Sequence, residues 1–215
     1  MKAPYSIAGG LLMIAGVVLA VASILAAGDA QSWDVANAFA AESMATTRRI
    51  GMLLSVSGLA ALVIATPVVV ARVYGTPGFG LVAGGWVGFA GGTVLFAMAF
   101  GLAAIAMPAL GELAVSGAVS PQRVADRFIR QPPIILAFLG GNITFLSWVP
   151  IGIGLGRSGL FPRWLSWLVA VTGITAWLGF LHVPVIDRYV NPLWPLAVAL
   201  VGGHLMRRDG VTTEP

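Results

Sequence analysis

Long uncharged apolar runs follow one another along the chain, separated by short segments that hold the charged residues. The shortest run has 18 residues, and about 20 apolar residues are enough to cross the hydrocarbon core of a bilayer. Because a bilayer offers the backbone no hydrogen-bond partners, each run must be a helix, and the runs are too long for barrel strands. The runs are Ala3 to Gly28, Ile50 to Ala71, Val73 to Gly111, Gln131 to Gly156, Trp164 to Ile186 and Tyr189 to Met206.

This pattern predicts an all-α fold, an integral membrane bundle of six transmembrane helices that forms a single domain over residues 1–215. The connections between helices 1 and 2 and between helices 3 and 4 are each predicted to contain a short interfacial helix. The first begins near Trp33, and the second is capped by Ser120 with Pro121 in its first turn. The membrane helices are predicted at about Tyr5 to Ala27, Ile50 to Ala71, Leu81 to Ala106, Pro133 to Leu155, Trp164 to Leu181 and Pro192 to Met206.

Composition and charge agree with a membrane location. Hydrophobic residues make up 58% of the chain and charged residues 9%, against about 25% charged residues in a soluble domain. The net charge of +4 comes from basic residues beside helix ends, which favours interfacial anchors over nucleic-acid binding. Six crossings place both termini on one side. We expect a multi-pass protein of the cell membrane with cytoplasmic termini, because the loops on that side are short and basic.

Four glycines of the third helix recur at every fourth position: Gly80, Gly84, Gly88 and Gly92. Small residues at this spacing let another helix approach closely in a membrane. The pattern predicts a packing face for a neighbouring helix of the same chain, with a homo-oligomer interface as the alternative.

The sequence excludes several kinds of chemistry. The chain has no cysteine, so disulfides and thiolate catalysis are absent, and Lys2 is the only lysine, so no intramembrane Schiff base can form. The middle of each predicted helix lacks charged residues, which argues against proton pumping. His182 and His204 lie too far apart to share a metal. We therefore expect no cofactor and no metal.

Acidic residues gather on the side of the membrane opposite the termini. A carboxylic acid there is a candidate proton donor to a hydrophobic substrate, although a solvated rim explains the same residues. The candidate catalytic residues are Glu42, Glu112, Asp126 and Asp187.

Aromatic and polar residues within the predicted helices are candidates for ligand contact. Aromatic faces can stabilise a cation, but tryptophan is also common at membrane interfaces, and Asn142 alone can join two helices by a hydrogen bond. The candidate ligand-binding residues are Trp86, Asn142, Ser147, Trp148, Trp177 and Trp194.

Two segments carry a family resemblance. G-R-S-G-L-F-P-R-W-L-S-W, from Gly156 to Trp167, and A-N-A-F-A-A-E-S, from Ala36 to Ser43, resemble a bacterial family of six-helix membrane proteins known as a domain of unknown function. The resemblance implies the six-helix fold and brings no catalytic residues.

Three functions stay open at this stage. The leading hypothesis is a multi-pass membrane protein that binds a small hydrophobic or lipid-like molecule within its bundle. The alternative is an intramembrane acid-base enzyme, of isomerase or cyclase type, acting on an isoprenoid or lipid. A facilitator of neutral solutes would need a polar path, for which the candidates are Ser55, Ser57, Thr93, Asn142 and Thr172.

Overall fold

The computed structural model describes residues 3–26, 46–118, 120, 132–180 and 190–210. Every regular element among these residues is a helix, which confirms the all-α prediction. The helices are α1 (Ala3–Ala26), α3 (Thr46–Arg72), α4 (Phe79–Val115), α6 (Pro132–Leu146), α7 (Trp148–Ser158), α8 (Arg163–Phe180) and α10 (Leu193–Gly210). The two predicted interfacial helices, near Trp33 and Ser120, fall largely on residues 27–45 and 121–131, outside the described part of the chain.

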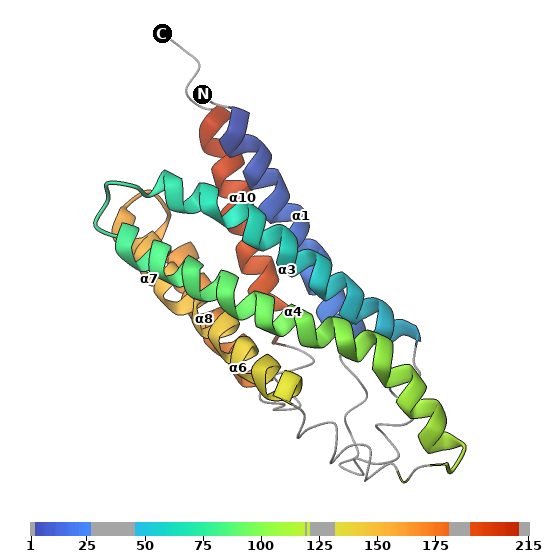
Figure 1. Ribbon diagram of the computed structural model, residues 1–215. Helices are drawn as coiled ribbons and strands as arrows, with labels where there is room; N and C mark the ends of the chain where they lie inside the picture. Colours follow the sequence, from blue (N-terminus) through green and yellow to red (C-terminus); the bar gives the residue numbers. More distant parts are fainter. Residues whose placement is uncertain (1–2, 27–45, 119, 121–131, 181–189, 211–215) are drawn as a thin grey trace.

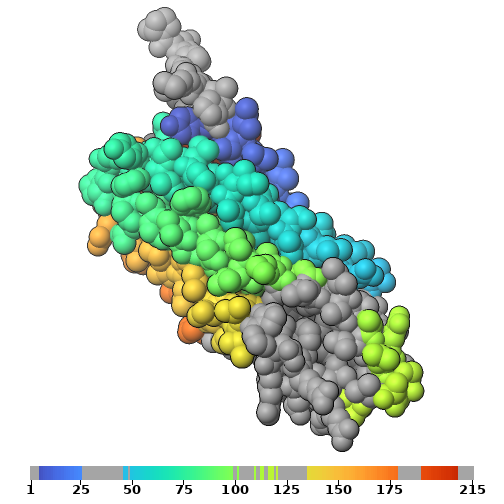
Figure 2. Space-filling model, in the orientation of Figure 1, coloured from blue at the N-terminus to red at the C-terminus, as the bar shows by residue number. Residues whose placement is uncertain are grey.

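Four described segments are long and apolar enough to cross a membrane: Tyr5–Leu25, Arg49–Arg72, Phe79–Met98 and Ile135–Ser158. Leu193–Arg207 is a shorter apolar helix. These segments indicate a membrane protein. Figure 2 shows one face of the molecule, with α3 and α4 running across it. The exposed side chains of these two helices include the apolar residues Ile64, Val87 and Val94.

One predicted helix boundary was wrong, and one predicted helix contains a local interruption. The third helix was expected to end near Pro108, but α4 continues to Val115, because a proline costs a helix one hydrogen bond and is tolerated where the axis bends. Figure 1 shows that bend in the second half of α4. The fourth helix is interrupted at Ser147 between α6 and α7. Since Ser147 N–H still donates to the Ile143 carbonyl (3.0 Å), α6 and α7 act as one rod.

The helices pack as a closed ring. In order round the ring, α1 lies beside α3, α3 beside α4, α4 beside the α6–α7 rod, the rod beside α8, α8 beside α10, and α10 beside α1. Chain neighbours are antiparallel, so α1 begins and α10 ends at the same end of the molecule (Figure 1). Side chains directed inward from all six positions of the ring form one hydrophobic core.

Small residues set seven positions apart bring α4 and the α6–α7 rod together. A methyl group at Gly78 would overlap the carbonyl oxygen of Gly154, and methyl groups at Gly85 and Gly92 would lie 2.8 Å from the carbonyl oxygens of Ser147 and Gly140. The two residue numbers sum to 232 in each of these three pairs. A constant sum means that the two helices are antiparallel and keep the same register along the contact. A seven-residue repeat returns to nearly the same helix face, so the contact continues along both helices.

The predicted packing face on α4 is therefore partly wrong. Gly88 and Gly92 do meet the α6–α7 rod, with Gly88 against the Ser147 side chain, but Gly80 and Gly84 have open space beside them. Steps of four residues advance by about 40° beyond a full turn, whereas steps of seven fall short by only about 20°. The face that packs thus follows the seven-residue set Gly78, Gly85 and Gly92.

The pair α1 and α10 uses the same device, which closes the ring. A methyl group at Gly9 would lie 2.7 Å from the carbonyl oxygen of Gly202, and one at Gly16 would overlap the carbonyl oxygen of Pro195. Both helices again offer contact positions seven residues apart. Close backbone approach at these positions fixes the first and last helices of the chain side by side.

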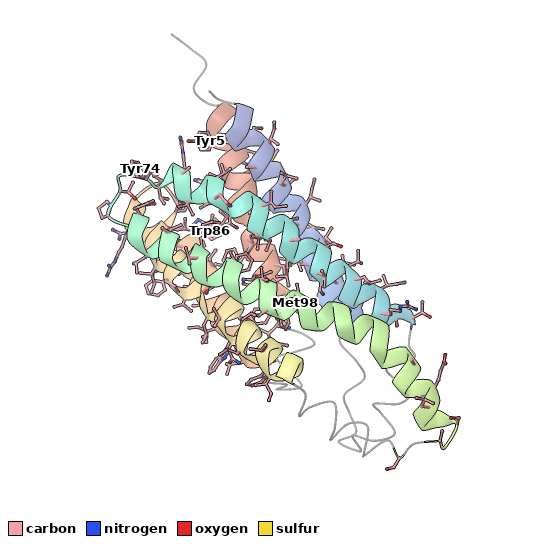
Figure 3. All side chains as sticks on the ribbon, viewed as in Figure 1. Tyr5, Tyr74, Trp86 and Met98 are labelled. Carbon is pink, nitrogen blue, oxygen red and sulfur yellow. The ribbon has the colours of Figure 1, made fainter. Side chains whose placement is uncertain are left out.

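The end of the ring that holds the start of α1 carries basic and aromatic residues. Arg157, Arg163 and Arg207 are exposed there, and the Arg72 guanidinium lies 5.2 Å from the centre of the Tyr5 ring. Figure 3 shows Tyr5 and Tyr74 together at this end. Trp164 and Trp167 are exposed in the first two turns of α8, so this end has the composition of a membrane interface.

Candidate functional site

An aromatic cluster occupies the inside of the ring. The Trp148 ring lies edge to face against Phe89 of α4, with centroids 5.0 Å apart, and against Trp194 of α10, at 5.5 Å. Phe145 of α6 joins Trp194 at 5.5 Å and Phe96 of α4 at 5.8 Å. Since α10 is not a ring neighbour of α4 or of the α6–α7 rod, these side chains bridge the interior rather than a contact between adjacent helices.

One stripe of α4 supplies the near side of this cluster. Trp86, Phe89, Thr93 and Phe96 follow each other at intervals of three or four residues, which places them on one face of the helix. Trp86 lies between the start of α4 and Met98 (Figure 3). Phe89 and Phe96 contact the cluster directly, and Thr93 lies between them on the same face, so the stripe lines the interior.

Buried polar atoms without a hydrogen-bond partner concentrate at this place. Among the described residues there are four, the indole nitrogens of Trp86, Trp148 and Trp194 and the hydroxyl oxygen of Thr93. Trp148, Trp194 and Thr93 are each only 3% exposed. Proteins pair nearly all buried polar groups, and an unpaired donor costs about 1–3 kcal/mol. All four atoms belong to the aromatic cluster or to the α4 stripe. The energetic cost of unpaired buried groups therefore falls on this one part of the interior.

Thr93 is the exception among the buried hydroxyl groups of the described chain. The other five donate to the carbonyl four residues earlier in sequence, as when Thr66 donates to Leu62 at 2.6 Å and Thr144 to Gly140 at 2.8 Å. Ser147, Ser166 and Thr172 do the same. Thr93 could make this bond to Phe89 and does not, so its hydroxyl keeps its hydrogen-bonding capacity inside the ring.

The six predicted ligand-binding residues fall into two groups. Trp86, Trp148 and Trp194 carry unpaired N–H groups. Asn142, Ser147 and Trp177 are satisfied within the protein: the Trp177 indole donates to Asn142 Oδ1 (2.7 Å), the Asn142 amide donates to the Phe138 carbonyl (2.6 Å), and the Ser147 hydroxyl donates to the Ile143 carbonyl (2.5 Å). Asn142 therefore joins α6 to α8, the structural role weighed for it from the sequence.

This helix-joining bond gives a first testable prediction. Replacing Asn142 by Leu leaves the Trp177 N–H without its acceptor, and we expect a loss of about 1–3 kcal/mol in the free energy of unfolding. In a Trp177→Phe background the same replacement should cost less, because no donor is left unpaired. A double-mutant cycle in mixed detergent and SDS micelles measures the difference, and a coupling near zero would contradict the assigned role.

The four predicted acids are not gathered by the described structure. Glu112 is exposed near the end of α4. Glu42, Asp126 and Asp187 fall on residues outside the described part of the chain. Among the described residues no charged side chain is buried, and the buried polar side chains are serines and threonines besides the indoles. The interior that the structure describes is therefore electrically neutral, apart from the dipoles of its donors.

The residues considered for a polar solute path do not share one lining. Ser55, Asn142 and Thr172 each bond a carbonyl of their own helix, and Ser57 does so on the exposed surface of α3. Of the five, only Thr93 keeps an unpaired buried hydroxyl. These five residues thus supply one unpaired hydroxyl inside the described ring rather than a series.

Phe89 and Phe96 were not predicted from the sequence as site residues, and Thr93 was not connected with the tryptophans. The signal that was available is the spacing from Trp86, since positions three, seven and ten residues later share its helix face. Trp194 could not be joined to Trp148 from sequence, because their contact depends on how α10 closes the ring.

Comparisons of the chain with protein-family models, with curated proteins and with solved structures find no match. The segment from Gly156 to Trp167, which carries the resemblance noted from sequence, forms the end of α7, the turn at Gly159 and the start of α8. Gly159 has a positive φ of 69° as the C-cap of α7. The segment thus marks a helix boundary, and the family resemblance stays a prediction.

Proposed function

We propose that this protein is a multi-pass membrane protein that binds a small hydrophobic molecule inside its ring of helices. The observation that carries the proposal is the set of unpaired donors on Thr93, Trp148 and Trp194, all deeply buried and all at one aromatic cluster. A bound molecule with an apolar body would pack against the aromatic rings and accept hydrogen bonds that the chain leaves open.

The absence of water inside a bilayer strengthens this argument. An unpaired N–H in a soluble protein can meet solvent through small fluctuations, but hydrocarbon supplies no acceptor. Apart from Thr93, the buried hydroxyl groups of the described helices each donate to a nearby backbone carbonyl. Unpaired hydroxyl groups are therefore not a general feature of the packing. A ligand at the cluster accounts for their concentration at one place.

The proposal includes six crossings: α1, α3, α4, the α6–α7 rod, α8 and α10. The helix α8 has 18 residues, which is within the range that spans a bilayer, and α10 contains the shorter apolar helix Leu193–Arg207. Their places in the ring support spanning, because each packs along a longer apolar helix, α8 on the rod and α10 on α1. The termini are proposed to be cytoplasmic, at the end where exposed arginines collect.

The orientation can be tested with single cysteines, since the natural chain has none. Tyr74, 74% exposed, lies at the end with the termini, and Ser116 is exposed just after α4 at the other end. In intact cells a membrane-impermeant maleimide should label Ser116→Cys and spare Tyr74→Cys, with both labelled after lysis. The reverse labelling would place the termini outside.

Ligand binding can be tested with an alkyl diazirine photoprobe in detergent solution. We expect saturable labelling of peptides that contain Thr93, Trp148 or Trp194, competed by unlabelled probe analogue. Peptides on the outer face, such as the one with Met98 (64% exposed), should be labelled without saturation because micelle contact is nonspecific. Labelling confined to the outer face would overturn the proposal.

A further inference from the structure

We propose that the ligand is an uncharged molecule whose carbonyl oxygen accepts hydrogen bonds from Trp148 and Trp194. The inference rests on the proposed function and adds the chemical class of the ligand. The ligand class follows from the hydrogen-bond donors that the described interior offers and from the buried charges that it lacks.

The polarity of the site is one-sided. An indole N–H donates and cannot accept, whereas a threonine hydroxyl does both. The unpaired groups at the cluster are indole donors and the Thr93 hydroxyl, and every other buried hydroxyl of the described chain is bonded to its own helix. A ligand that only donates would find one partner, while an acceptor would find several.

The absence of buried charged side chains from the described interior disfavours two further classes of ligand. An anion would have no buried base to pair with, and a cation would have aromatic faces and no buried acid, while charge in a low-dielectric interior is very costly to leave uncompensated. No charged side chain is buried among the described residues. A neutral acceptor with an apolar body remains, and a carbonyl carried on a hydrocarbon chain or ring has that combination of properties.

The two indoles are in edge contact with each other. Their ring centroids lie 5.5 Å apart with planes at 69°, and they come from α7 and α10, which are not ring neighbours. A carbonyl oxygen has two lone pairs and can accept from two donors at once. A ligand held by both would also connect two helices that do not pack directly on each other, so its binding should stabilise the fold.

Equilibrium binding to the purified full-length protein in detergent tests the inference. The probes are a short-chain ubiquinone, dioctanoylglycerol and the hydrocarbon squalane. We expect at least one carbonyl probe to bind more tightly than squalane. Tighter binding of ubiquinone would indicate a ring ketone as the ligand carbonyl, and tighter binding of dioctanoylglycerol would indicate an ester. Trp148→Phe and Trp194→Phe keep an aromatic ring and remove the donor, and each should weaken the carbonyl probe by about threefold to tenfold.

The control is Trp167→Phe, which removes an indole that is 65% exposed and should leave binding unchanged. Thr93→Val gives a second variant of nearly constant volume in case a tryptophan variant does not fold. If squalane binds as tightly as both carbonyl probes, or if the three donor variants bind like the natural protein, the carbonyl inference is wrong while ligand binding stands. Such a result would mean that each indole N–H group already interacts with the face of a neighbouring aromatic side chain. If no probe binds, the proposed function fails as well.

Discussion

Gly92→Ala should destabilise the protein by about 1–3 kcal/mol, because α4 and α6 would have to move apart. The added methyl group would lie 2.7 Å from the Thr144 nitrogen and 2.8 Å from the Gly140 carbonyl oxygen. Both are backbone atoms of the facing helix, so no side-chain rotation can make room. The free energy of unfolding in mixed detergent and SDS micelles measures the effect.

The neighbouring residue provides a matched control. Gly91 belongs to the same helix and has nothing within 4 Å of an added methyl group. Gly91→Ala should therefore be neutral or stabilising by up to about 1 kcal/mol, since alanine favours the helix over glycine. Equal effects of the two substitutions would show that the seven-residue contact between α4 and the α6–α7 rod does not hold the helices together.

Trp148→Ala should be the most damaging single substitution in the ring, with a loss of about 3–5 kcal/mol. Trp148 is 3% exposed, and its ring contacts Phe89 and Trp194. Its removal leaves a large space at the point where α4, α7 and α10 meet through side chains. Unfolding in mixed micelles, with helix content followed by circular dichroism, measures the loss.

Trp167→Ala is the comparison for this substitution. It removes the same side chain from a position on α8 that is 65% exposed, and it should change the unfolding free energy by no more than about 0.5 kcal/mol. A similar cost for Trp148→Ala and Trp167→Ala would mean that the aromatic cluster contributes little, and the ring would then rest on its glycine contacts alone.

The fold was largely predictable because membrane helices follow from local composition. Runs of apolar residues bounded by charged residues gave α1 and α3 to within a few residues, since hydrocarbon forces each run to satisfy its own backbone. The end of α4 was not predictable in this way. Pro108 reads as a helix terminator from its neighbours alone, and whether a helix bends or stops at a proline depends on its surroundings.

Contacts between helices were harder to predict than the helices themselves. The glycines of α4 could be recognised as packing residues, but both four-residue and seven-residue sets exist among them, and only the partner decides between the two. Gly140 and Gly154 of the rod have the matching spacing, and the pairing became evident once the antiparallel arrangement was known.

The candidate site was predictable in its residue types and not in its assembly. Trp148 and Trp194 were recognised as candidates from sequence, but 45 residues separate them, and their contact requires α10 to close the ring against α1. The unpaired state of their N–H groups is a property of the assembled interior. By contrast, the role of Asn142 could be anticipated, because an amide in an apolar helix needs a partner on a neighbouring helix.

Native mass spectrometry of the natural protein, released intact from mild detergent, tests the ligand-binding account most directly. We predict a peak that carries one apolar molecule of defined mass, which is diminished in the Trp148→Phe, Trp194→Phe double variant and retained in Trp167→Phe. Bare protein after purification, together with no mass shift on addition of ubiquinone or dioctanoylglycerol, would contradict the account and leave the aromatic cluster as structural core alone.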